Sequence, residues 1–185
     1  GYGAGQNITT GSSHTIIGSN AGDAITTCHG SVLIGFNAGT AMTFGDFNTL
    51  IGTSAGAAVV TASNNTAVGY FAATATICSN NVAVGACAMA ANTQGQDNVV
   101  IGLKAGATQV ASGCNNVFVG SCVGAVALCQ DNTLIGAYAG VAQTTATGNT
   151  MVGLCVGYGV VGGGGNVYIG YKAGLVNTSG ICNVF

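Results

Sequence analysis

Side chains that could carry acid–base chemistry are few in this sequence and stand far apart. Histidine occurs only at His14 and His29. The carboxylates are equally scattered, at Asp23, Asp46, Asp97 and Asp131. General acid–base catalysis needs titratable groups within hydrogen-bond reach of a substrate. We therefore expect no catalytic residues, no enzyme activity and no bound cofactor.

Motifs that bind phosphate, calcium or nucleic acid are also absent. The two basic residues, Lys104 and Lys172, lack the glycine spacing of a phosphate-binding loop. The run Gly162–Gly165 leads into Asn166 rather than into the aspartate pattern of calcium-binding repeats. The formal net charge is −2, which provides no polybasic surface for nucleic acid. We expect neither a metal site nor a nucleic-acid partner.

Cysteine is frequent, but its spacing does not match that of a zinc site. No two cysteines are arranged as Cys-x-x-Cys. Cys87, Cys122 and Cys155 share one position of the repeat described below, but each stands two units from the next, or about 9.5 Å. A disulfide needs Cα atoms within about 7 Å. Intrachain disulfides are therefore not expected, whereas interchain bridges and cysteine as a small packing residue both remain open. The others are Cys28, Cys78, Cys114, Cys129 and Cys182.

The composition differs from that of an ordinary soluble domain. Hydrophobic residues make up 49% of the 185 residues, but charged residues only 3%, against roughly a quarter in typical domains. Neutral polar side chains replace the charges, as suits a fibre in which stacked identical charges would repel one another. The purest apolar stretch, 117–129, contains Ser121 and is shorter than the about 20 residues that span a bilayer. We expect no membrane span in this segment.

An internal repeat of 16 to 18 residues covers the whole chain. Its reference point is a glycine preceded by Ile or Val, here called position 0. Position −4 is Asn in nine repeats, and position +3 is mostly Ala. The position 0 glycines are Gly1, Gly18, Gly35, Gly52, Gly69, Gly85, Gly102, Gly120, Gly136, Gly153 and Gly170.

A β-branched unit of this length predicts an all-β fold, a parallel β-solenoid of about eleven coils with two short strands per coil. Period-two alternation puts positions −3 and −1 on one side of the first strand and −4 and −2 on the other. We expect the −1 column, such as Ile17 and Ile34, to form a buried spine and the Asn column to form an amide ladder. The second strand is expected around positions +6 and +8.

Two repeats in particular, 132–140 (Asn-Thr-Leu-Ile-Gly-Ala-Tyr-Ala-Gly) and 166–174 (Asn-Val-Tyr-Ile-Gly-Tyr-Lys-Ala-Gly), are similar to known fibre repeats. They resemble the head repeats of trimeric autotransporter adhesins and the related repeats of phage and giant-virus tail fibres. The resemblance covers essentially the whole chain. It implies a left-handed parallel β-roll, a homotrimer, and a structural or adhesive fibre segment that is extracellular, on a cell or virion surface, with a host surface or matrix ligand. The longer coil and the frequent cysteines depart from the better-known adhesin heads.

The −2 column supports a trimer separately from the resemblance. If the −1 column is buried, position −2 faces outward, yet it holds residues such as Leu33, Phe118 and Tyr168. A monomer would then expose a long apolar stripe, and sister chains are expected to cover it. The alternative is a broader single-chain core that takes in both faces.

Two other functions fit the repeat. One is a self-assembling extracellular filament or sheath subunit without receptor binding. The other is an ice-binding solenoid, which requires a flat outward array of threonine. Here the threonine column at +8 is interrupted, which favours an inward position instead. The interrupting residues are Val60, Ile77, Val110, Leu128 and Val161.

Residues 1–185 are expected to be a single repeat array from a longer fibrous chain. Gly1 is already a position 0 glycine, and the segment 182–185 repeats the start of the strand motif. Open solenoid edges need capping units or further coils.

Overall fold

The computed structural model describes residues 1–76, 78–108, 113–124 and 130–185. Within these residues there is no helix, and a strand of three residues recurs once per repeat. No helix in this part of the chain is long and apolar enough to cross a membrane. The strands are β1 (Thr15–Ile17), β2 (Val32–Ile34), β3 (Thr49–Ile51), β4 (Thr66–Val68), β5 (Val82–Val84), β6 (Val99–Ile101), β7 (Val117–Val119), β8 (Thr133–Ile135), β9 (Thr150–Val152) and β10 (Val167–Ile169).

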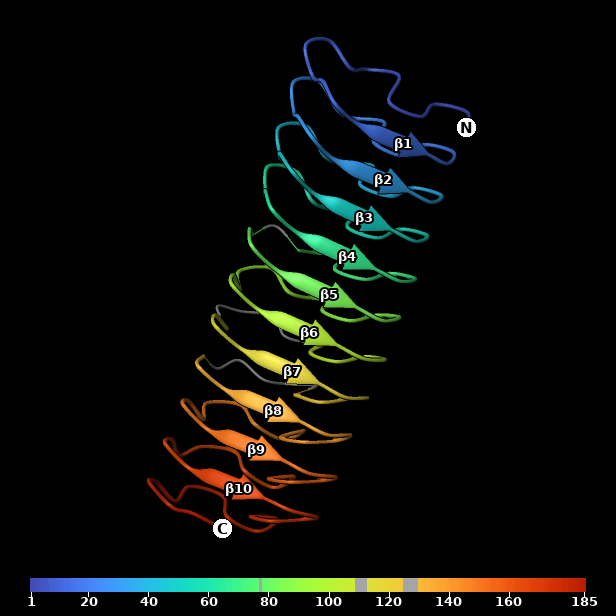
Figure 1. The fold of residues 1–185 in the computed structure, drawn as a ribbon. Coiled ribbons are helices and arrows are strands. Elements are labelled where there is room, and N and C mark those ends of the chain that lie inside the picture. The colour runs from blue at the N-terminus through green and yellow to red at the C-terminus, as the bar shows by residue number, and fades with distance from the viewer. Residues whose placement is uncertain (77, 109–112, 125–129) are drawn as a thin grey trace.

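The ten strands form one parallel sheet in the order of the sequence, from β1 to β10. Each strand pairs in register with the same positions of the next repeat, as Thr15 does with Val32. Figure 1 shows the strands stacked as the rungs of a rod, with the chain termini at opposite ends. The expected all-β parallel solenoid is confirmed, with about nine turns between β1 and β10.

Glycine at position 0 ends each strand because no larger residue fits there. Gly35 has a φ of +138°, and a Cβ on it would lie 2.5 Å from the carbonyl oxygen of Gly52 in the next coil. Backbone therefore packs directly on backbone along the rod. The close approach explains why the glycine recurs in every repeat.

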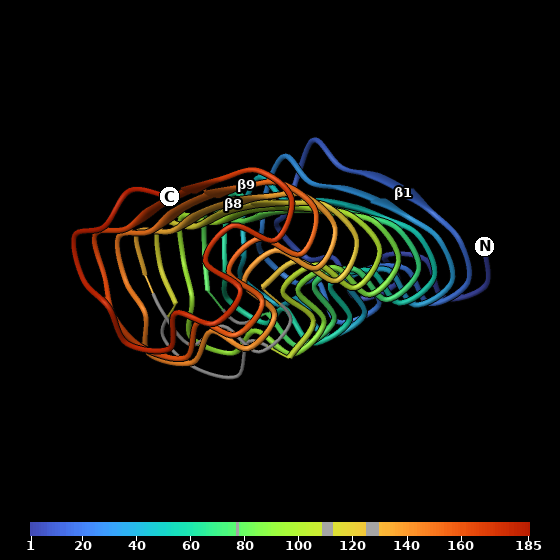
Figure 2. The ribbon, with the colours of Figure 1, turned by 90° about the horizontal axis from the view of Figure 1, so that it is seen from below.

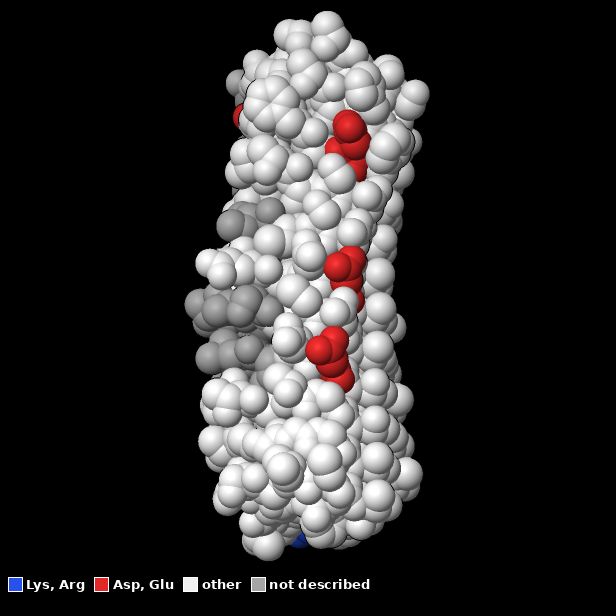
Figure 3. All heavy atoms as spheres, turned by 90° about the vertical axis from the view of Figure 1, so that its left-hand side faces the viewer, with Lys and Arg blue, Asp and Glu red and all other residues white. Residues whose placement is uncertain are grey.

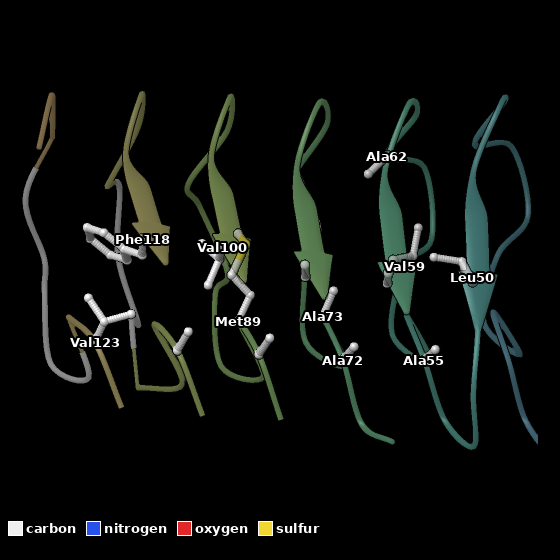
Figure 4. Packing of buried hydrophobic residues seen from close by; sticks show 14 of the residues in the cluster. Leu50, Ala55, Val59, Ala62, Ala72, Ala73, Met89, Val100, Phe118 and Val123 are labelled. Atoms are coloured by element: carbon white, nitrogen blue, oxygen red, sulfur yellow. The ribbon is translucent and has the colours of Figure 1, made fainter. Parts of the chain in front are cut away.

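The core lies between the strand and the opposite half of each coil. It is built from three columns, at positions −2, +3 and +7, as in Leu33, Ala38 and Met42, none of which is exposed. Figure 4 shows strand residues such as Leu50 and Phe118 among half-turn residues such as Val59 and Ala72 inside the stack.

The prediction of a buried −1 spine is wrong, and the two sides of the strand are exchanged. Ile17 and Ile169 at position −1 are 56% and 63% exposed, whereas Leu33 at position −2 is fully buried. Alternation sets which positions share a side, but it does not say which side faces inward when both are apolar. The glycine at position +4 indicates which side faces inward, because a Cβ on Gly39 would lie 3.0 Å from the side chain of Leu33. That glycine makes room for the −2 residue inside the coil.

The second strand expected at +6 and +8 is not formed in the described residues. Coil-to-coil bonds do occur there, as from the backbone nitrogen of Thr43 to the carbonyl oxygen of Val60 at 2.9 Å. At +7, however, the nitrogen of Met42 donates back to the oxygen of Gly39 at 3.1 Å. This local turn interrupts the extended backbone. Figure 2 shows the strands along one side of the rod and the bent half-coils opposite them.

Position +8 faces outward rather than inward. Val60 and Val161 at this position are 41% and 45% exposed, whereas Ile25 and Val59 at +7 are fully buried. The predicted inward position of this column is therefore wrong. The other three interrupting residues, Ile77, Val110 and Leu128, lie outside the described residues.

Candidate functional site: the outer sheet face

The asparagine column at −4 lies inside the coil and bonds each repeat to the next. The side-chain nitrogen of Asn48 donates to the carbonyl oxygen of Ala62 at 2.8 Å. Its side-chain oxygen accepts from the backbone nitrogen of Asn65 at 3.0 Å. Both groups belong to the following repeat, and Asn48 is fully buried. The ladder is thus structural, since it satisfies backbone groups that no strand pairing reaches.

One short repeat interrupts this pattern. Repeat 69–84 is one residue shorter than the usual 17, and within the described chain the side-chain nitrogen of Asn65 finds no hydrogen-bond partner. The second short repeat, 120–135, does not have this effect, since the side-chain nitrogen of Asn116 before it donates to the side-chain oxygen of Asn98 at 3.0 Å.

Histidine takes the place of asparagine in the first ladder position. The Nδ1 atom of His14 accepts from the backbone nitrogen of Ser31 at 3.3 Å, and Nε2 lies 2.8 Å from the carbonyl oxygen of Cys28. These contacts suit a neutral ring with its proton on Nε2. The other histidine, His29, contacts the Ser12 hydroxyl at 3.1 Å through Nδ1. Both rings hold neighbouring repeats together.

The carboxylates are held singly by the turn next to them. Asp97 accepts from the side-chain nitrogen of Asn80 at 3.0 Å, and Asp131 accepts from that of Asn115 at 3.1 Å. Figure 3 shows acidic groups separated along the length of the rod, on a face that carries almost no other charge. In the part of the chain that the structure describes, no three His, Cys, Asp or Glu residues gather as metal ligands.

The cysteines of the described chain are all free thiols. Burial raises the pKa of the Cys28 thiol above its usual range, and burial does the same for Cys78. These thiols therefore stay protonated at neutral pH and are poor nucleophiles. Cys129 lies outside the described residues.

Three cysteines share position +2 as their spacing indicated. Cys87, Cys122 and Cys155 occur in left-handed turns with φ between +52° and +56°. Lys104 and Tyr138 occupy the same position in the intervening repeats, also at positive φ. One repeat without a cysteine at this position therefore lies between each thiol and the next, so no two of the three thiols are in adjacent repeats.

The feature that stands out is the outer sheet face, defined by positions −3 and −1 of strands β1 to β10. Position −3 is Thr or Val, and position −1 is Ile or Val in every strand. Ile101 and Ile135 are 38% exposed, and the remaining −1 residues are exposed or half-buried. The face is therefore one continuous, uncharged, β-branched surface along the rod. Sequence reasoning found the stripe but assigned it to the wrong column.

Comparison with protein-family models, with curated proteins and with solved structures finds no match for this chain. The proposals below therefore depend on the geometry and on the repeat.

Proposed function

We propose that this chain is a structural, adhesive fibre segment of a cell or virion surface, and that it assembles as a homotrimer through the outer sheet face. The observation that carries the proposal is the continuous, uncharged face of ten strands, lined by Ile, Val and Thr. Ten strands at about 4.8 Å make a face about 45 Å long and about 10 Å wide, or on the order of 400 Å². An area of this order matches the largest apolar patches of soluble monomers, about 300 to 600 Å², and patches of that size often serve as interaction sites.

The shape of the face supports assembly along the whole rod. The outward columns contain only Ile, Val and Thr, whose branched side chains pack well against a second β surface. Every strand is in register with the next, so a copy that fits at one repeat fits at all of them. The resemblance of the repeats to trimeric adhesin heads favours three copies around a common axis. It also leads us to propose a left-handed roll of eleven coils.

The near absence of charge supports a fibre rather than a catalyst. Stacked positions bring identical side chains within about 5 Å of one another, and charges at that spacing would repel. Neutral polar residues avoid the repulsion, and only 3% of this chain is charged. The histidines and aspartates that are present bond to groups of neighbouring repeats. A rigid scaffold with a long outer surface is what this arrangement can provide.

Light scattering on the purified chain tests the assembly. We expect a mass three times the 17.8 kDa of one chain. The double variant Ile101→Gln/Ile135→Gln places polar amides in the proposed interface and should dissociate the trimer. The matched control Val60→Gln/Val161→Gln changes residues of similar exposure, 41% and 45%, on the other side of the coil and should stay trimeric. A stable wild-type monomer, or equal behaviour of the two doubles, would contradict the proposal.

A further inference from the structure

The two residues that follow the position 0 glycine form a second surface column, here called the turn row (positions +1 and +2). The nitrogen at +2 of each repeat donates to the oxygen at +1 of the preceding repeat. Asn20 donates to Tyr2 at 2.8 Å, and the same bond recurs in every later pair of repeats, as far as Lys172 to Leu154 at 3.1 Å. The turn row therefore stacks in register along the rod, one repeat per step.

Large and small side chains alternate along the turn row. The first, third, fifth, seventh, ninth and eleventh repeats place a large residue there, and all of these residues are exposed. The even repeats place small residues there, namely Ser19 with Asn20, Thr53 with Ser54, Ala86 with Cys87 and Ser121 with Cys122, until Leu154 breaks the pattern. The large residues are Tyr2 (87% exposed), Phe36 (52%), Tyr70 (58%), Leu103 (53%), Tyr138 (45%) and Tyr171 (66%).

The alternation sets a spacing of two repeats. Because successive strands lie about 4.8 Å apart, the large side chains of every second repeat recur at about 10 Å. They are aromatic except in the seventh repeat, where Leu103 takes the place of a ring. The small residues leave an open step between one ring and the next. The period is a property of the surface alone, since the buried columns of the coil repeat at every step.

The spacing of about 10 Å can be compared with the repeat lengths of extended polymers that could lie along the turn row. A peptide strand repeats every two residues, or about 7 Å, and does not match the row. An extended β-1,4-linked polysaccharide turns each sugar by half a rotation relative to the last, so its faces recur once per disaccharide, at a length close to that of two repeats. A polyproline helix has a similar pitch of about 9 Å, but its partners hold it in aromatic-lined grooves. The turns that follow the strands project at the side of the rod (Figure 1), and the rings on them are exposed, which suits flat stacking on an open surface.

The chemistry of the row fits a sugar polymer. The C–H face of a β-linked pyranose ring is weakly positive and packs on the negative face of an aromatic ring. Ser19, Asn20 and Thr53 occupy the steps between rings and carry hydroxyl and amide groups that suit the equatorial hydroxyls of a stacked sugar. The side-chain nitrogen of Asn20 also donates to the side-chain oxygen of Asn37 at 3.3 Å. No charged side chain occurs in the turn row before Lys104. An uncharged polymer meets no unpaired charge there.

From this geometry we propose that the turn row binds an extended, uncharged β-1,4-linked polysaccharide, with one large side chain for each disaccharide, aromatic in five of the six odd repeats. This inference deepens the adhesive role proposed above, on which it rests, by naming the class of ligand. The first three rings, Tyr2, Phe36 and Tyr70, span a length that six sugars cover.

Calorimetric titration of the assembled protein with cellohexaose tests the proposal. We expect binding that is at least about tenfold tighter than that of maltohexaose, whose α-linkages curve the chain away from a straight row. The double variant Phe36→Thr/Thr53→Phe moves one ring by a single repeat and keeps the composition. Loss of one ring contact should weaken binding about fivefold. The control Phe44→Ser removes a ring that is 59% exposed at another position and should leave binding unchanged.

The outcomes separate this inference from the proposed assembly. A trimer that binds no cellohexaose, or that binds equally well after the ring is moved, overturns the ligand and leaves the trimer standing. Preference for a polyproline peptide also overturns it. A wild-type monomer that still binds cellohexaose contradicts the trimer and supports the turn row. Circular dichroism checks that the double variant is folded, and Tyr70→Ser, in another repeat, repeats the test if it is not.

Discussion

Replacing Asn48 by leucine should destabilise the fold far more than a similar change on the surface. Leucine has the same number and branching of side-chain heavy atoms, although its methyl groups are bulkier, and it can neither donate nor accept. The carbonyl oxygen of Ala62 then loses a 2.8 Å bond, and the backbone nitrogen of Asn65 loses a 3.0 Å bond. Both groups face the interior, where water cannot replace the asparagine.

Each buried backbone group left without its bond costs about 1 to 3 kcal/mol, so the pair amounts to about 2 to 6 kcal/mol. For a chain of this size such a loss lowers the melting temperature by roughly 5 to 15 °C. Thermal melts followed by circular dichroism, at one protein concentration, measure the shift. The concentration must be fixed because assembly adds to the apparent stability.

The control for this experiment is Thr61→Leu, an exposed position in the next repeat. A surface change of this kind should stay within about 0.5 kcal/mol of wild type. Equal melting temperatures for Asn48→Leu and Thr61→Leu would show that the ladder contributes nothing and would refute the reasoning. A loss for Asn48→Leu alone would support it.

Three further predictions follow from other columns. His14→Asn should keep the melting temperature within about 2 °C of wild type, because asparagine makes the same two contacts elsewhere in the ladder. His14→Leu should lower the melting temperature, because leucine makes neither contact. Equal melting temperatures for the two variants would contradict the role assigned to His14. Gly35→Ala should be among the most damaging single changes, because its Cβ would meet the carbonyl oxygen of Gly52 at 2.5 Å; a wild-type melting curve would refute the close contact. Burial raises the pKa of the Cys28 thiol, so the unfolded chain loses this proton first as the pH rises, and stability should fall above about pH 9. Cys28→Val should reduce that fall, as denaturation at a series of pH values will show, and an unchanged pH profile would count against the burial.

Much of the fold can be predicted from the sequence because stacking repeats each requirement at every step. The position 0 glycine and the −4 asparagine mark the coil length, and the β-branched run between them marks the strand. Both are confirmed in β1 to β10. In a solenoid each unit contacts only its neighbours, so a local pattern is enough to define the architecture.

The direction in which each column faces could not be read from the pattern used. Leu33 and Ile34 are adjacent and both apolar, so hydrophobicity did not tell which one enters the core. The deciding signal is steric: glycine at +4 leaves room for the −2 side chain. The same difficulty affected position +8, where the local turn at +7 shifts the alternation. The candidate surfaces follow only once these orientations are known.

The alternation in the turn row could not be predicted from the sequence for a different reason. The alternation has a period of two repeats, so positions +1 and +2 differ between successive repeats and look variable when single repeats are aligned. Tyr2, Phe36 and Tyr70 become a pattern only when the hydrogen bonds between successive turns show that these positions stack.

The direction of the hydrogen bonds has a mechanical consequence. In a solenoid the bonds between coils point along the rod, so tension on its two ends pulls on all the bonds of one layer at once. The layers are arranged in series, so each one bears the full force and the weakest layer yields first. One released coil of about 17 residues lengthens the chain by about 50 Å, while the remaining coils keep their pairing. A fibre built in this way resists small forces stiffly and gives way to large ones one coil at a time.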